Sequence, residues 1–244
     1  MYREIFNVRS MILAFGLIMS FMQFGCWHLQ PAGEAKKIKV AFAGDSTVAS
    51  YKEAYIAGWG QVISKYFKDN VSVENFAISG RSTKTFIKNG DWQKLLQSKP
   101  DYILLQFGHN DSHAKGKPES TDAATEYKDN LRKFVDEAEK AGARVIFVTP
   151  MHRRTFGNDG KLTDILLPYA NVMKDVAKEK NILCIDLHAS SGKLMQDLGD
   201  EKSTFLSCKP ADRTHFSQTG ADKMAELIVL DLKQTDSPLK NYLK

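Results

Sequence analysis

Several features that would point to particular chemistries are missing from this sequence. Its three cysteines form no Cys-x-x-Cys pair and its six histidines show no metal-ligand spacing, so we expect no structural or catalytic zinc. No Gly-x-Ser-x-Gly motif occurs, which excludes a nucleophile elbow of that type. The 34 Lys and Arg residues outnumber the 29 Asp and Glu residues, for a net charge of +5. They are scattered along the chain and not clustered with aromatic residues, so no nucleic-acid partner is expected.

The first 35 residues differ in composition from the rest of the chain. Two arginines precede an uncharged apolar stretch, residues 11–22, which is typical of an export signal. The stretch is shorter than the roughly 20 residues of a comfortable membrane span, which disfavours a retained anchor. Small residues at 33–35 suit a signal peptidase, whereas Gly25-Cys26 suits lipoprotein processing. We therefore predict a leader over residues 1–35 and export to the periplasm or the medium, with lipid attachment through Cys26 as an open alternative.

Two cysteines remain beyond the leader, Cys184 and Cys208. An exported protein could pair them in a disulfide. Cys184, however, lies in an apolar, strand-like run, where a buried free thiol is the more usual state. We favour free thiols, and the pairing stays open because the sequence does not show whether the two backbones approach.

Five short runs of β-branched or apolar residues recur along the chain and are typical of strands. They are Ile38–Ala43, Val71–Ala77, Tyr102–Phe107, Arg144–Thr149 and Ile182–Leu187. Between them, apolar residues three and four apart are typical of helices at residues 59–67, 131–138 and 166–176. This alternation predicts the α/β class, with a five-stranded parallel sheet covered by helices on both faces.

The end of the chain has the pattern of one more helix. It is predicted to begin after Ser217, a candidate N-cap, and to continue through Leu232. The lysine-rich tail after Ser237 is expected to be a loose terminus. Because no repeat or break in composition follows the leader, residues 36–244 are predicted to form one domain. No predicted helix presents an exposed apolar stripe, so a monomer is the default expectation.

Four short polar islands follow predicted strands or precede the last helix. They are Gly44-Asp45-Ser46-Thr47, Ser79-Gly80-Arg81, Gly108-His109-Asn110-Asp111 and Asp212-Arg213-Thr214-His215. The first three should gather at one edge, because the carboxyl ends of parallel strands meet there. Ser46 is expected where the first strand ends and a helix begins, so that an oxyanion beside it faces a helix N-terminus.

The islands contain the groups that acyl transfer to water requires. Ser46 would be the nucleophile and His215 the base, since an ordinary imidazole has a pKa of about 6.5. Asp212 would accept a hydrogen bond from the other ring nitrogen. The N–H groups of Ser46 and Gly80, with the side-chain amide of Asn110, would form the oxyanion hole. Singly, these residues have structural alternatives as helix caps, turns or loops, but their joint occurrence favours catalysis.

The islands, taken in order, resemble the blocks of SGNH/GDSL-family hydrolases: Gly-Asp-Ser, Gly, Gly-x-Asn-Asp and Asp-x-x-His. The resemblance extends from Lys37 to the last helix. The first and third blocks, and Val148-Thr149-Pro150 followed by Arg153-Arg154, are most similar to rhamnogalacturonan acetylesterases. Ser-Thr in place of Ser-Leu in the first block disfavours a lipase. The resemblance implies a flavodoxin-like three-layer α/β/α fold. It also implies a secreted serine esterase that deacetylates pectic polysaccharide through an acetyl-Ser46 intermediate, without metal or other cofactor.

Substrate contacts are predicted from side chains next to these blocks. Arg81, Arg153 and Arg154 could pair with a galacturonate carboxylate, because a guanidinium suits bidentate recognition. The alternative is that they are ordinary surface or structural arginines. His109 adjoins Asn110 and could shape the site. The other histidines beyond the leader carry no motif apart from His215, and we expect structural or surface roles for His113, His152 and His188.

Two other kinds of function stay open at this stage. One is an acetylesterase for xylan or another neutral glycan, or an esterase or thioesterase for small acyl groups. The other is a carbohydrate-binding protein without catalytic activity that uses the same cleft, which the intact set of Ser46, Asp212 and His215 disfavours.

Overall fold

The structure is a computed structural model that describes residues 36–244; the predicted leader, with Cys26, lies outside these residues. One sheet has the strand order β2-β1-β3-β4-β5, and each neighbouring pair is parallel. The strands are β1 (Ile38–Gly44), β2 (Val71–Asn75), β3 (Tyr102–Gln106), β4 (Arg144–Val148) and β5 (Cys184–Ile185). The predicted five-stranded parallel sheet is confirmed.

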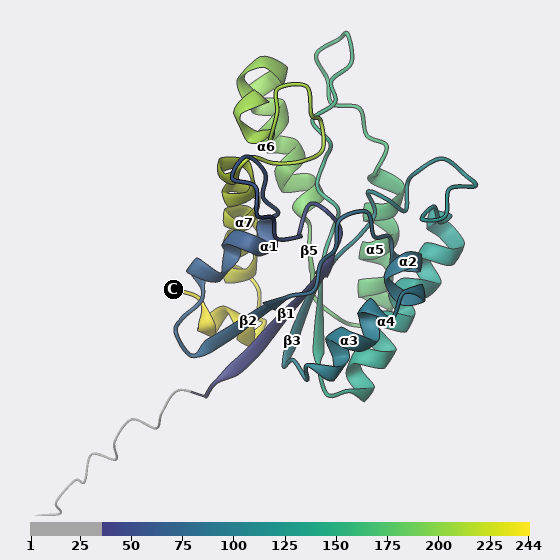
Figure 1. Cartoon of the computed structure of the whole chain (residues 1–244), viewed down its shortest axis with the longest axis vertical. Helices are drawn as coiled ribbons and strands as arrows, with labels where there is room; N and C mark the ends of the chain where they lie inside the picture. Colours follow the sequence, from purple (N-terminus) through teal and green to yellow (C-terminus); the bar gives the residue numbers. More distant parts are fainter. Residues whose placement is uncertain (1–35) are drawn as a thin grey trace, which may run out of the picture. The chain divides into compact units, whose positions relative to one another are not determined.

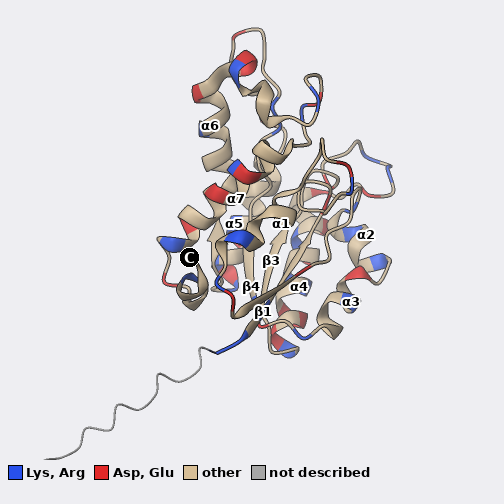
Figure 2. Ribbon diagram, turned by 60° about the vertical axis from the view of Figure 1, so that its left-hand side comes forward, with Lys and Arg blue, Asp and Glu red and all other residues tan. Residues whose placement is uncertain are grey.

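Helices cover both faces of the sheet, which gives the predicted three-layer α/β/α fold (Figure 1). One face carries α2 (Thr83–Lys88), α3 (Asp91–Gln97), α4 (Lys128–Lys140) and α5 (Leu167–Glu179), and the other carries α1 (Trp59–Val62) and α7 (Gln218–Lys233). The remaining long helix, α6 (Leu187–Lys202), packs against α7. Lys and Arg residues and Asp and Glu residues are both scattered over the surfaces of the helices (Figure 2).

Alternate strand residues supply two apolar cores, one on each face of the sheet. From β1, Val40 and Phe42 belong to the core shared with α1 and α7, whereas Ala41 and Ala43 belong to the core under α3, α4 and α5. Trp59 packs edge-on against Phe42, with ring centroids 5.3 Å apart. Because each fully buried large side chain contributes about 1.5–3 kcal/mol, the two cores hold the strands in register and thereby place their carboxyl ends.

Several predicted elements are shorter in the structure, among them β2, which ends at Asn75 and not at Ala77. Residues 59–67 were expected to form one helix, but the chain forms α1 and then a 3-10 helix over Ile63–Tyr66. The fifth predicted strand shrinks to the two residues of β5, because Asp186 caps α6 by accepting a hydrogen bond from the N–H of Ala189 at 3.2 Å. A side-chain cap therefore ends the strand before the apolar run ends.

The C-terminal tail is ordered against the domain, so the expectation of a loose terminus is wrong. Pro238–Tyr242 form a 3-10 helix, Leu239 and Leu243 are buried, and the N–H of Lys244 donates to the carbonyl of Tyr66 at 2.8 Å. Ser217 is the predicted N-cap of α7, accepting a hydrogen bond from the N–H of Gly220 at 3.0 Å. Within residues 36–244, no helix has both the length and the apolarity that crossing a membrane requires.

Candidate active site

Ser46 lies in a tight turn directly after β1. The Asp45 carboxylate organises this turn by accepting hydrogen bonds from the N–H and hydroxyl of Thr47, at 2.9 and 2.6 Å. The next helix, α1, begins only at Trp59. The expected helix N-terminus behind Ser46 is therefore absent, and side-chain hydrogen bonds in place of a helix dipole position the nucleophile.

A buried glutamine from the neighbouring strand supports this turn. Gln106, the last residue of β3, donates from Nε2 to Thr47 Oγ1 at 2.6 Å and accepts from Trp59 Nε1 at 2.9 Å. Sequence reasoning missed this residue. The available signal was a polar residue at the end of an otherwise apolar strand, since a buried amide is retained only with hydrogen-bond partners.

The predicted catalytic side chains form one hydrogen-bonded chain. His215 Nε2 lies 3.0 Å from Ser46 Oγ, and His215 Nδ1 lies 3.0 Å from Asp212 Oδ2. Burial by itself would raise the pKa of Asp212, but hydrogen bonds from the N–H groups of His215 and Thr214 outweigh it and bring that pKa to about 2. An ionised Asp212 keeps the proton on Nδ1, which leaves Nε2 free to take the Ser46 proton.

Among the described residues, each of the three predicted oxyanion donors keeps an N–H hydrogen that no backbone carbonyl accepts. Gly80 has a φ of +80°, a conformation that favours glycine, and a Cβ there would meet nothing within 4 Å. Among the described residues, neither the Ser46 nor the Gly80 N–H donates to a backbone carbonyl. Asn110 Nδ2 donates one hydrogen to the carbonyl of Arg81 at 2.8 Å, which holds the amide in place while its second hydrogen remains available.

Two further side chains contact this site and were not predicted. The Tyr51 hydroxyl donates to the main-chain carbonyl of Ser46 at 2.7 Å. The Cys208 thiol donates to Asp212 Oδ2 at 3.5 Å, and Cys184 and Cys208 are both free. No motif would have revealed these roles, because the contacts join side chains through the fold.

His109 is buried beneath the site, and its predicted contact with substrate is not supported. Its exposed fraction is 1%, and its Nδ1 lies 3.5 Å from Asp45 Oδ2, too far for a good hydrogen bond. Burial lowers the pKa of His109, which favours the neutral imidazole. The ring therefore fills the space behind the Ser46 turn.

All three arginines that were candidates for substrate binding are engaged with the protein itself. The Arg81 side chain pairs with Asp91 at 2.5 Å and is 27% exposed. Arg153 donates to Thr214 Oγ1 at 2.7 Å and to the carbonyl of His109 at 3.0 Å, and so connects two of the islands. Of the three, Arg81 and Arg153 remain partly exposed, whereas Arg154 is buried.

Arg154 is a structural residue, and its prediction as a substrate ligand is wrong. Only 3% of it is exposed, and it donates to Ser207 Oγ, to the carbonyl of Pro210, and to both the carbonyl and the carboxylate of Asp200. The planar guanidinium of Arg154 thus joins the loop after β4 to residues 200–210, which precede Asp212. Only a guanidinium has donors in all these directions.

Arg154→Lys is therefore expected to lower the free energy of unfolding by about 2–3 kcal/mol, since hydrogen bonds from a buried charged group are lost. Urea unfolding followed by circular dichroism measures this. Arg132, an exposed arginine that also contacts carboxylates, provides the matched control as Arg132→Lys, with a much smaller loss. Equal losses in the two variants would contradict the structural role of Arg154.

Asp111, at the end of the third island, is buried and accepts hydrogen bonds from the hydroxyls of Thr83 and Thr121 at 2.5 and 2.9 Å. Burial raises the pKa of Asp111 from its ordinary 3.8 to about 7. Between these two values the folded protein binds more protons than the unfolded chain, so raising the pH lowers its stability.

Asp111→Asn removes this titration. We expect the stability of the wild type, relative to the variant, to fall as the pH rises from about 4 to about 7. Unfolding free energies of both proteins at pH 4.5 and 7.5 test this. Parallel pH profiles for the two proteins would show that Asp111 does not titrate in this window.

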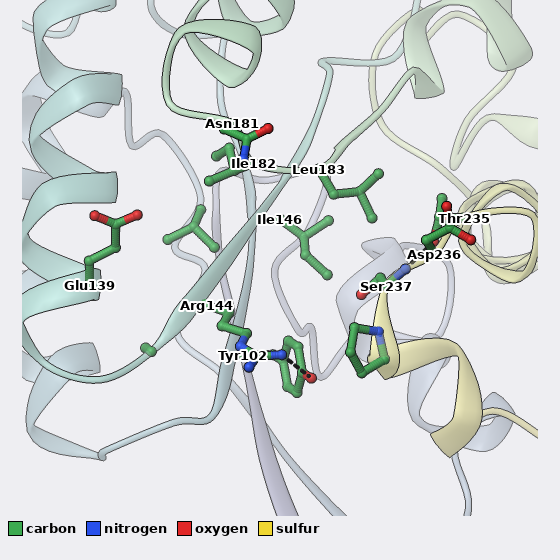
Figure 3. A pocket seen from close by; sticks show the side chains of 13 residues that line it. Tyr102, Glu139, Arg144, Ile146, Asn181, Ile182, Leu183, Thr235, Asp236 and Ser237 are labelled. Atoms are coloured by element: carbon green, nitrogen blue, oxygen red, sulfur yellow. Dashed lines mark hydrogen bonds between the residues drawn. The ribbon is translucent and has the colours of Figure 1, made fainter.

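A pocket with a volume of about 520 Å³ lies at the opposite edge of the sheet and does not belong to the active site. Its lining includes Tyr102 and Arg144, which are the first residues of β3 and β4, together with Ile182 and Ser237 (Figure 3). Ser46, by contrast, follows the carboxyl end of β1. In α/β sheets of this kind, ligands bind at the carboxyl edge, so the geometry of the triad locates the candidate site.

The site joins a serine, a histidine and an aspartate by hydrogen bonds at the carboxyl edge of the sheet in a three-layer α/β/α fold. This is the arrangement of a serine hydrolase. Residues 42–223 match the GDSL-like Lipase/Acylhydrolase family. The chain belongs to this family and is a carboxylic ester hydrolase.

Named relatives and a solved structure agree with this assignment. Rhamnogalacturonan acetylesterase RhgT of Bacillus subtilis is 38% identical over 85% of this chain and 95% of its own length. An acetylxylan esterase of Xylanibacter ruminicola is 27% identical over 83% of this chain and 45% of its own length. The crystal structure of the Bacillus subtilis protein YxiM superposes with a TM-score of 0.73 at 29% identity, over 82% of this chain and 57% of that longer one.

Proposed function

We propose that this protein is a serine acetylesterase that removes O-acetyl groups from polysaccharide, with acetylated rhamnogalacturonan as its preferred substrate. The observation that carries the proposal is the continuous chain from Ser46 Oγ through His215 to Asp212, with both links 3.0 Å long. The relatives include polysaccharide acetylesterases, which supports acetyl as the acyl group and polysaccharide as the class of substrate.

The proposed reaction has two steps. In the first, Ser46 Oγ attacks the acetyl carbonyl while His215 Nε2 takes its proton. The N–H groups of Ser46 and Gly80 and the Asn110 amide hold the tetrahedral oxyanion, until the C–O bond to the sugar breaks and His215 returns the proton to the leaving sugar hydroxyl. In the second, His215 takes a proton from a water that attacks the acetyl carbonyl of acetyl-Ser46. The C–O bond to Ser46 Oγ then breaks, His215 returns the proton to Oγ, and acetate leaves.

Preference for an acidic glycan is supported by the 38% identity to RhgT and by the position of Arg81. The carbonyl of Arg81 accepts the hydrogen bond from Asn110, so its side chain starts beside the oxyanion hole. Its guanidinium pairs with Asp91 through Nε, and its two terminal nitrogens face the Asn89 side-chain oxygen at 3.1 and 3.2 Å. The side chain is 27% exposed, so a galacturonate carboxylate would pair with its exposed edge in competition with these two partners.

Acetate release from acetylated rhamnogalacturonan, acetylated xylan and a small neutral acetyl ester tests the proposal. We expect the wild type to favour rhamnogalacturonan. Arg81→Ala should lower kcat/KM on rhamnogalacturonan by about tenfold more than on the neutral ester. The reason is that it removes the proposed ion pair, with its hydrogen bonds, between Arg81 and the galacturonate carboxylate. Lys84→Ala, in the exposed pair with Glu126, is the matched control.

The outcomes separate the alternatives. Equal losses of kcat/KM on acidic and neutral substrates would show that Arg81 does not bind the substrate carboxylate. The variant would then have disturbed the oxyanion hole alone. Wild-type activity on xylan equal to that on rhamnogalacturonan would leave an acetylesterase without acidic preference. No acetate from any substrate would favour the carbohydrate-binding alternative.

We further propose that the protein is exported and acts as a monomer in the periplasm or outside the cell, where polymeric glycans are encountered. The apolar stretch at residues 11–22, which follows basic residues, supports this location. Detection of the processed chain in a periplasmic or culture fraction, with mass spectrometry of its first residue and of Cys26, tests cleavage and lipidation. Light scattering of the purified protein tests the monomer.

A further inference from the structure

A second cluster of titratable side chains lies apart from the triad and has no part in the proposed reaction. The histidine–aspartate cluster consists of His152, in the loop after β4, Asp164, ahead of α5, and His188, in the first turn of α6. Each offers one ligand atom, and these atoms lie within 4.8 Å of one another. Within the described part of the chain, this is the single group of at least three His, Cys, Asp or Glu residues with such geometry.

Two of the three distances inside the cluster match those between ligands of one metal ion. Asp164 Oδ2 lies 3.0 Å from His188 Nε2 and 3.4 Å from His152 Nε2. Ligands held at about 2.0–2.1 Å around a tetrahedral zinc ion are roughly 3.3 Å from each other. The carboxylate oxygen therefore has the spacing of a coordination shell from each ring nitrogen, and the two histidine ligand atoms lie within 4.8 Å of each other.

The hydrogen bonding of His188 directs its Nε2 toward Asp164. His188 Nδ1 lies 2.9 Å from the carbonyl oxygen of Pro150. A carbonyl only accepts, so Nδ1 donates in this hydrogen bond, and Nε2 is the ring nitrogen that faces Asp164 Oδ2 at 3.0 Å. An Nδ1–H held by a backbone carbonyl is how metal-ligating histidines are oriented.

The two imidazoles are stacked beside Asp164. The His152 and His188 rings are 4.0 Å apart at an interplanar angle of 22°, and each presents a ring nitrogen to the same carboxylate oxygen. Because an imidazole lone pair lies in the plane of its ring, the rings would tilt toward each other to bind one divalent ion together with Asp164.

The protein holds the His152 ring firmly in place. A Cβ on Gly192 of α6 would lie 2.6 Å from His152 Cδ2, so only glycine lets the helix approach this closely. The N–H of His152 donates to Ser191 Oγ at 3.0 Å. The site is nevertheless open on one side, since the Asp164 side chain is 28% exposed. An ion could enter from solvent without unfolding the loop.

We propose that this cluster binds one divalent transition-metal ion, with zinc as the fitting candidate, through Nε2 of both histidines and one oxygen of Asp164. Two imidazoles and a carboxylate suit zinc, and water would take the fourth position. The ion would fasten the loop after β4 to α6. Arg153 follows His152 in that loop and contacts Thr214 and the His109 carbonyl, so the ion would steady the wall of the active site without entering the chemistry.

Metal titration of the chelator-treated protein tests this independently of esterase activity. Calorimetry with zinc should show one site, and cobalt should give the visible absorption of a tetrahedral centre. His152→Gln and Asp164→Asn should each lower zinc affinity at least about tenfold, because losing a direct ligand costs no less than losing an outer partner. His113→Gln, at an exposed histidine 2.7 Å from Glu119, is the matched control and should bind as the wild type does.

Thermal unfolding provides the second measurement. Zinc should raise the Tm of the wild type and of His113→Gln and raise that of Asp164→Asn less at the same zinc concentration, because stabilisation by a folded-state ligand falls as its affinity falls. Asp164 is partly exposed, so its variant should fold even if His152→Gln does not. Absence of saturable binding in the wild type, or equal affinity in the wild type and Asp164→Asn, overturns the proposal.

Discussion

Ser46→Ala is expected to lower kcat for acetate release by about 10⁴- to 10⁶-fold, the range found when the nucleophile of a serine hydrolase is removed. Among the described residues, the Ser46 hydroxyl is hydrogen-bonded to His215 and to no other group. The turn itself is held by Asp45, Thr47 and Gln106, which remain. Activity should therefore be lost with little change in Tm.

Single-turnover and steady-state acetate assays measure this effect, and a serine-reactive phosphonate followed by mass spectrometry locates the nucleophile. Ser50→Ala is the matched control, since Ser50 is an exposed serine four residues further along that bonds to Asn75 Nδ2 at 3.1 Å. It should keep activity close to that of the wild type. A Ser46→Ala protein that retains a hundredth of the activity or more would assign the nucleophile elsewhere.

Asp212→Asn is expected to lower kcat by about 10⁴-fold while leaving the fold intact. Asn keeps the oxygen that accepts from the N–H groups of Thr214 and His215. Its amide nitrogen, however, would donate to His215 Nδ1, which moves the imidazole proton to Nε2. A protonated Nε2 cannot accept the Ser46 proton, so the variant has the wrong tautomer for attack.

Rates on acetylated rhamnogalacturonan and on a small acetyl ester should fall by the same factor in this variant, because the defect lies in proton transfer and not in glycan binding. Cys208→Ala is the control, since it removes a weaker donor from the same carboxylate. Its effect should be small by comparison. A loss below about 100-fold in Asp212→Asn would mean that His215 is oriented by another group.

Periodic hydrophobicity was enough to predict the architecture of the domain. The runs at Tyr102–Phe107 and Arg144–Thr149 are apolar except at or next to their ends, as is expected of strands buried on both faces, and both became strands with ends within one residue of the prediction. Hydrophobic periodicity did not predict local structure that depends on individual side-chain contacts. Asp186 caps α6 and shortens β5, and packing of Leu239 and Leu243 orders a tail whose lysines had indicated a loose end.

The residues of the triad were predictable because their chemistry restricts the residue types and their order along the chain. Substrate arginines were not, because guanidinium groups serve equally well to bind carboxylates and to join loops. Arg153 and Arg154 are adjacent in the sequence, yet one contacts Thr214 beside His215 and the other is buried among Ser207, Pro210 and Asp200. Only the paths of the surrounding loops distinguish them.

The sequence by itself therefore determined the α/β class, the parallel sheet and the identity of Ser46, Asp212 and His215, because these depend on periodicity and on side-chain chemistry. The tertiary structure decided which polar groups meet. Gln106 and Tyr51 support the nucleophile turn across the fold, and His152, Asp164 and His188 come together from three segments with no recognisable spacing. Contacts between distant segments depend on how helices and loops pack on the sheet, which no local pattern encodes.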